Sequence, residues 1–128
     1  MNRLYLKNAR GEYYYGIPIE DLGLAAVLAI EFKNYVPFIM ITDSDDNSIF
    51  ESENGVIIFP DNIDLKKIRS LGLVESLMPQ DISEMKSLLK RRAETKPYSR
   101  EFIEIEAALI AGSISEDIDI FGIGWERA

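Results

Sequence analysis

An Asn-Gly pair at residues 54–55 separates two short apolar segments and constrains the fold more than any other feature of the chain. Asn-Gly is the strongest short signal for a two-residue β-hairpin turn, because both residues tolerate a positive φ. Residues 48–52 form a short segment of alternating polarity. Residues 54–60 begin with the Asn-Gly turn and end at Pro60. Residues 36–42 are a continuous apolar run typical of an inner strand. We therefore expect an antiparallel meander of three strands over residues 36–60.

A long apolar segment before this meander predicts a helix over residues 18–33. Pro18 suits the first turn of a helix, and Glu20 and Asp21 place negative charge near the positive end of the helix dipole. Apolar side chains cover much of the circumference of this helix. Such a helix is buried on several sides, so we expect it to pack centrally against the sheet.

Two further helices are expected after the meander. The pattern at residues 61–73 predicts a short helix that ends at Gly72. A stronger pattern begins after Asp81, where Glu84 three residues later resembles a capping box. The predicted buried stripe of this second helix consists of Ile82, Met85, Leu88 and Leu89. The basic residues 90–92 fall at its C-terminal end, where the helix dipole favours positive charge.

The two ends of the chain mix the sequence patterns of strands and helices. Leu4 and Leu6, followed by turn residues 8–11, predict a hairpin whose second arm carries Tyr13, Tyr14 and Tyr15. Residues 98–112 alternate in part like a strand, but their length and helix-forming composition favour a helix capped by Ser99 and ended by Gly112. Residues 115–125 predict a closing strand, with Ile118 and Ile120 inside and Asp117 and Asp119 outside.

These elements predict one globular domain over residues 1–128 with an α/β (α+β) fold. We expect a mostly antiparallel sheet of about five or six strands, with three or four helices packed mainly on one face. The chain is 47% hydrophobic, which is enough to bury a core without a disulfide or a structural metal.

The absence of histidine and cysteine excludes several classes of active site. A Ser-His-Asp triad, a Cys-His pair and a zinc site built on these residues are all impossible. We therefore predict a protein that is not an enzyme, with no catalytic residues and no cofactor. The N-terminus lacks the apolar core of a secretory signal, and the longest apolar run, residues 22–30, is too short to span a bilayer. A cytoplasmic location without membrane association is expected.

The formal net charge of −8 argues against direct nucleic-acid binding through a basic face. The charge is distributed in blocks: residues 41–64 hold seven acidic and no basic residues, whereas residues 65–100 hold nine basic and four acidic residues. This distribution is explained by a solvated surface on which the acidic and basic segments pair with each other across the fold. An acidic surface that steers a cationic partner explains it equally.

The acidic stretch around residue 45 partly resembles a metal-binding loop. Asp43, Asp45 and Asn47 match the opening of a calcium loop. Ser48 then replaces the glycine of that loop, and Asn54 replaces its final bidentate glutamate. A weaker calcium site or a metal-dependent enzyme that uses only carboxylates stays open as an alternative.

The leading hypothesis is a binding protein with an acidic surface for a basic protein partner. Its most concrete form is an inhibitor or immunity protein that neutralises a cationic toxin or nuclease. The predicted partner-binding residues are Asp43, Asp45, Asp46, Glu51 and Glu53, a second patch of Asp117 and Asp119, and Tyr14 as an aromatic anchor. A regulatory or structural homodimer that buries the aromatic hairpin is a second hypothesis.

Overall fold

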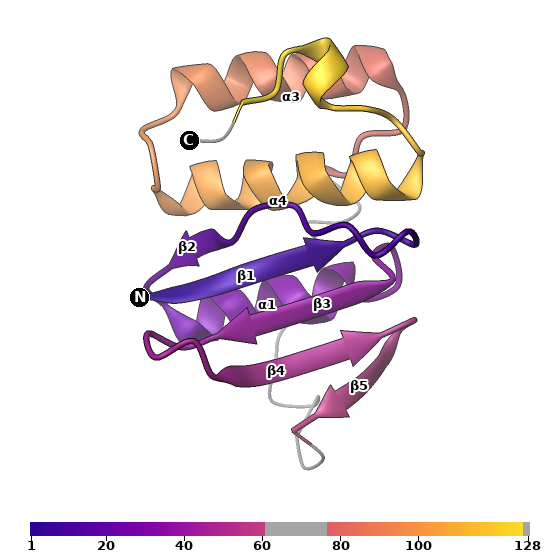
Figure 1. Cartoon of the computed structure of the whole chain (residues 1–128). Helices are drawn as coiled ribbons and strands as arrows, with labels where there is room; N and C mark the ends of the chain where they lie inside the picture. Colours follow the sequence, from indigo (N-terminus) through magenta and orange to yellow (C-terminus); the bar gives the residue numbers. More distant parts are fainter. Residues whose placement is uncertain (61–76, 127–128) are drawn as a thin grey trace.

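Five strands form one antiparallel sheet in the computed structural model of the chain, which describes residues 1–60 and 77–126 (Figure 1). The strands are β1 (Asn2–Lys7), β2 (Ile17–Ile19), β3 (Phe38–Thr42), β4 (Ser48–Glu53) and β5 (Val56–Phe59). They lie in the order β2-β1-β3-β4-β5. The helices are α1 (Leu22–Phe32), α3 (Ile82–Glu94), α4 (Arg100–Ser115) and the short 3₁₀ helix η2 (Phe121–Ile123).

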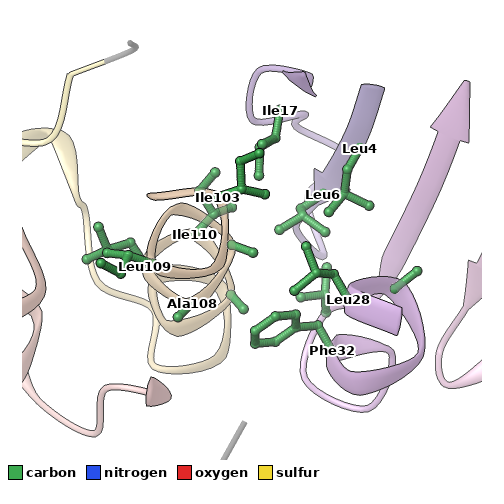
Figure 2. Packing of buried hydrophobic residues seen from close by; sticks show 14 of the residues in the cluster. Leu4, Leu6, Ile17, Leu28, Phe32, Ile103, Ala108, Leu109 and Ile110 are labelled. Atoms are coloured by element: carbon green, nitrogen blue, oxygen red, sulfur yellow. The ribbon is translucent and has the colours of Figure 1, made fainter. Parts of the chain in front are cut away.

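The helices cover one face of this sheet. In Figure 1, α1 lies behind β1 and β3, and α4 runs beside β2 and β1, with α3 packed on the far side of α4. Leu4 and Leu6 of β1 point between α1 and α4, where they meet Leu28, Phe32 and Ile103 (Figure 2). This arrangement confirms the predicted α+β fold with an antiparallel sheet and helices mainly on one face.

The predicted meander over residues 36–60 is confirmed. β3, β4 and β5 pair in succession, and Phe38, Glu53 and Val56 are direct neighbours across the three strands. Asn54 and Gly55 both have positive φ, of 50° and 84°, as the hairpin signal requires.

The predicted start of the first helix at Pro18 is wrong. Pro18 lies in β2, where it pairs with Arg3, and α1 begins only at Leu22. Asp21 is the N-cap, because its carboxylate accepts hydrogen bonds from the backbone N–H groups of Gly23 and Leu24 at 2.8 and 3.3 Å. A proline is tolerated in β2 because this strand lies at the edge of the sheet, where no further ladder needs its missing N–H.

The second arm of the predicted N-terminal hairpin is mostly irregular. Tyr13 forms a single bridge with Lys7, and regular pairing with β1 resumes only at Ile17.

The expected strand over residues 115–125 is wrong. α4 extends to Ser115, and the chain then makes a turn and the 3₁₀ helix η2. Ile120 is nevertheless buried and Asp119 exposed, so the polarity pattern was correct while the backbone conformation was not.

The helices predicted near residues 81 and 100 are confirmed. Asp81 accepts a hydrogen bond from the Glu84 backbone N–H at 2.8 Å, and Glu84 accepts one from the Gln80 N–H at 2.6 Å, close to a capping box. Met85 and Leu88 are buried as expected, but Ile82 is exposed.

Ser99 caps α4 as predicted, by accepting a hydrogen bond from the Phe102 N–H. Gly112 does not end that helix; it lies inside α4 and packs against Pro79.

The helix predicted over residues 61–73 lies outside the described residues. Within the described part of the chain, no helix has the length and apolar character needed to cross a membrane.

Candidate functional site

The predicted acidic residues 43–46 form a tight turn between β3 and β4. The Asp43 carboxylate accepts hydrogen bonds from the backbone N–H groups of Asp45 and Asn47 at 2.9 and 3.0 Å. Asp46 has a positive φ of 65°, which asparagine and aspartate tolerate better than most residues. Asp43 therefore holds the turn together, while the side chains of Asp45 and Asp46 are exposed at its tip.

Glu51 and Glu53 follow that turn on β4, and the Glu51 carboxylate accepts a hydrogen bond from the Ser48 hydroxyl at 2.9 Å. They alternate with the buried residues Phe50 and Ser52, so both carboxylates project from the sheet face opposite the helices. Glu53 pairs with Phe38 at the start of β3, whereas the acidic turn follows the end of β3. The five carboxylates of residues 41–54 are thus spread from the acidic turn to the opposite end of β4.

A groove of about 840 Å³ brings together the other three predicted residues, Tyr14, Asp117 and Asp119. One wall comes from residues 8–14, which connect β1 to β2, and the other from residues 113–121 at the end of α4 and beyond. These segments lie about a hundred positions apart in the chain. The fold alone makes them neighbours, because α4 runs alongside the β1–β2 edge of the sheet.

The first wall is shaped by Asn8. Its side-chain oxygen accepts hydrogen bonds from the backbone N–H groups of Arg10 and Glu12, both at 3.0 Å, and Gly11 closes the turn with a φ of 83°. This turn directs Tyr13 and Tyr14 to different environments. Tyr13 is 47% exposed, while Tyr14 is half-buried and its hydroxyl lies 2.9 Å from Ser113 Oγ.

The second wall is shaped by the way α4 ends. The Ile118 N–H donates to the Ser113 carbonyl at 3.0 Å, and Asp117 adopts a positive φ of 50°. Asp119 then accepts a hydrogen bond from the Phe121 N–H at 3.1 Å, which starts η2. The result is an exposed Phe121 ring beside two exposed carboxylates.

The groove is predominantly acidic. Glu12, Asp117 and Asp119 contribute carboxylates, and Arg10 contributes the only guanidinium among the described residues that line it. Arg10 Nε lies 2.8 Å from Glu12 Oε1, so its charge is already paired. Neither Asp117 nor Asp119 forms an ion pair with any residue in the described part of the chain. These two carboxylates can therefore accept an external cation.

A buried polar cluster lies beneath this region and was not predicted. Glu106 of α4 is 0% exposed and is surrounded by donors from three other segments. It accepts hydrogen bonds from Trp125 Nε1 at 2.6 Å, from Arg92 Nη2 at 3.0 Å and from the Tyr15 hydroxyl. Arg92 Nε also lies 2.9 Å from Glu106 Oε1, although it is not aligned as a hydrogen bond.

Aromatic rings enclose the charges of this cluster. The Arg92 guanidinium carbon lies 5.0 Å from the centre of the Phe102 ring and 6.0 Å from that of Trp125. The rings of Trp125 and Tyr15 are 5.4 Å apart. Arg92 Nη2 also donates to the carbonyl of Glu126 at 2.6 Å. The cluster therefore fixes the C-terminal segment, and with it Phe121, against α3 and α4.

Burial raises the pKa of Tyr15 far above its usual value of 10.0, and the hydrogen bond to the Glu106 carboxylate raises it further. Glu106 is enclosed and paired with Arg92, so its contacts tie α3, α4 and the C-terminal segment together. No local sequence pattern links these residues, because Arg92 and Glu106 lie on different helices and Trp125 lies beyond both.

The described residues contain no group of three or more histidine, cysteine, aspartate or glutamate side chains placed to hold a metal ion. Asp43 and Asp45, the first two residues of the calcium-like pattern, lie in a turn where Asp43 bonds the backbone. Comparison with protein-family models, curated proteins and solved structures found no match to the chain.

Proposed function

We propose that this protein is a non-enzymatic binding protein that holds a basic protein partner in the groove between residues 8–14 and 113–121. In its most concrete form it is a cytoplasmic inhibitor or immunity protein that neutralises a cationic toxin or nuclease. One observation carries the proposal: Asp117 and Asp119 line a groove with exposed aromatic rings and have no cation of their own in the described part of the chain.

This combination suits a lysine or arginine side chain of a partner. A carboxylate binds the charged end, and an aromatic ring packs on the apolar stem or the guanidinium plane. Tyr13 and Phe121 supply exposed rings at the groove, and aromatic residues are frequent among the residues that dominate binding energy. The net charge of −8 adds long-range attraction, which raises the association rate with a basic protein.

A rigid scaffold supports the proposal further. The wall that carries Asp117 and Asp119 is joined to α4 through the Ile118–Ser113 bond, and the following segment is held by the Glu106 cluster. Groups fixed in this way lose little conformational freedom when a partner binds.

The test is an affinity capture from native cell lysate at low and moderate salt, followed by mass spectrometry. We expect a stoichiometric basic partner, whose affinity falls at least about tenfold when Asp117→Asn and Asp119→Asn are combined. Asparagine keeps a side-chain oxygen for the Phe121 N–H and tolerates the positive φ at residue 117, so the wall should keep its shape.

The matched control combines Asp45→Asn with Asp46→Asn, which removes the same charge at the tip of the β3–β4 turn. This control should reduce only the salt-dependent association rate. Equal affinity of the groove variant and the native chain would refute the proposal. A larger loss in the control than in the groove variant would move the binding site to the turn.

A further inference from the structure

The face of the sheet opposite the helices has no covering element within the described residues. It is the face turned toward the reader in Figure 1, with α1 behind it. β1 contributes Arg3 and Lys7 to this face, and β4 contributes Glu51 and Glu53. Positive and negative charges are therefore separated across the face, with Phe38 and Met40 of β3 between them.

One row of side chains across this face has opposite charges on either side of its centre. The backbone pairings place Tyr13 beside Lys7, Lys7 beside Phe38, Phe38 beside Glu53, and Glu53 beside Val56. From one end to the other the row is Tyr13, Lys7, Phe38, Glu53 and Val56, so two opposite charges flank a central aromatic ring. Tyr13 is 47% exposed and Val56 is 66% exposed, so both ends of the row are open to solvent.

The two charges in this row do not satisfy each other within one chain. They are separated by two strand spacings, about 10 Å. Lys7 Nζ instead lies over the rings of Tyr13 and Phe38, at 5.0 and 5.2 Å from their centres. Glu53 belongs to none of the ion pairs found among residues 1–60 and 77–126.

We propose that two copies of this chain dimerise through this face, around a twofold axis that runs along β3. This axis exchanges the two ends of the row. Lys7 of each copy then faces Glu53 of the other, Tyr13 faces Val56, and the two Phe38 rings meet at the axis. Face-to-face sheets pack about 10 Å apart, which a lysine and a glutamate can span together.

The charge pattern selects this axis over the alternative one. A twofold axis that runs across the strands would place Lys7 of one copy over Arg3 of the other, which is repulsive. The same pattern favours a second copy over an unrelated partner of one charge. A uniformly basic surface would be repelled by β1, and a uniformly acidic one by β4. A surface that carries both charges in the reversed order is what the chain itself offers.

The size of the face predicts a weak dimer. Strands about 4.8 Å apart and about 20 Å long give β1, β3, β4 and β5 a footprint on the order of 400 Å² per copy. This is about half of the roughly 800 Å² that each partner contributes to a standard stable interface. We therefore expect a reversible dimer with a dissociation constant between about 10 µM and about 1 mM.

Sedimentation equilibrium over a range of protein concentrations tests this proposal. The average mass should rise from 14.6 kDa toward twice that value as concentration increases. Glu53→Lys should raise the dissociation constant at least about tenfold, because each of two ion pairs becomes a repulsion. Asp45→Lys is the matched control: it changes the charge equally at the turn and should leave the dissociation constant within about twofold.

Mixing two variants gives a sharper test. Lys7→Glu alone and Glu53→Lys alone should each stay monomeric, while an equimolar mixture should form a one-to-one heterodimer. Circular dichroism melting of each variant establishes that both are folded. A native chain that stays at 14.6 kDa up to about 1 mM would overturn the proposal. So would a mixture that stays monomeric, or an equal effect of Glu53→Lys and Asp45→Lys. Tyr13 belongs to both surfaces, but the Asp117 and Asp119 variants do not alter the row, so they test the acidic groove without testing the dimer.

Discussion

Replacing the carboxylate of Glu106 should destabilise the protein strongly, because this side chain is fully buried and ion-paired. Glu106→Gln keeps the volume of the side chain but removes the negative charge that neutralises Arg92, whose side chain is only 14% exposed. The amide also presents N–H donors to a site that already holds donors from Arg92, Trp125 and Tyr15. Breaking one side of a buried ion pair costs about 3–5 kcal/mol, because the remaining charge stays buried and unpaired.

This free energy converts to a large change in melting temperature. An unfolding entropy of about 2.1 cal/mol/K per residue gives this 128-residue chain about 0.27 kcal/mol/K in total. A loss of about 3 kcal/mol, the lower end of the range, therefore lowers Tm by about 11 °C. Thermal and urea unfolding followed by circular dichroism measure this change directly.

The control for this experiment is Glu104→Gln, two positions away on the same helix. Glu104 pairs with Arg100 at 3.1 Å, but that arginine is largely exposed. Such a pair contributes about 0.5 kcal/mol or less, so Tm should change by no more than about 2 °C. The combined change Arg92→Met with Glu106→Leu should be more stable than Glu106→Gln, because no charge is left unpaired. Equal Tm values for Glu106→Gln and Glu104→Gln would refute the reasoning.

Two further outcomes follow from the same structure. Gly112→Ala should lower Tm although alanine favours helices, because its Cβ would lie 2.4 Å from Pro79 Cγ, and overpacking costs about 1–3 kcal/mol. An unchanged or higher Tm would contradict that packing. The raised pKa of Tyr15 means that the unfolded chain loses this proton above pH 10.0 while the folded chain keeps it. The stability that Tyr15 contributes is therefore complete below pH 10.0 and is lost above it, by about 1.4 kcal/mol per pH unit. Urea unfolding between about pH 9 and pH 11 should show a shallower decline for Tyr15→Phe, and identical slopes would disprove the assignment.

Features that depend on neighbouring residues were predictable from the sequence. The Asn54-Gly55 turn, the cap at Asp81 and the cap at Ser99 all act over four residues or fewer, and all three are present in the structure. Alternation of Leu4 and Leu6 likewise gave the correct inner face for β1. These local signals were sufficient for the α+β class and for the meander.

Features that depend on a distant partner were mispredicted or missed. Pro18 looked like the start of a helix, but pairing with Arg3 draws it into β2. Residues 115–125 alternate like a strand, but no strand pairs with them in the described part of the chain, and local hydrogen bonds at Asp119 and Trp125 fold them into a turn and η2 instead. The backbone needs a neighbouring strand to form a sheet, and a sequence pattern does not reveal whether one is present.

The same division applies to function. Composition by itself determined the excess of carboxylates and the exclusion of histidine and cysteine chemistry. Only the tertiary structure decided that Asp117 and Asp119 share a groove with the Tyr13–Tyr14 segment, while Asp45 lies at a distant turn. It also decided that Glu106 is enclosed with Arg92. The physical reason is that charge and hydrophobicity are properties of single residues, whereas a binding site and a buried ion pair exist only once packing has brought distant residues together.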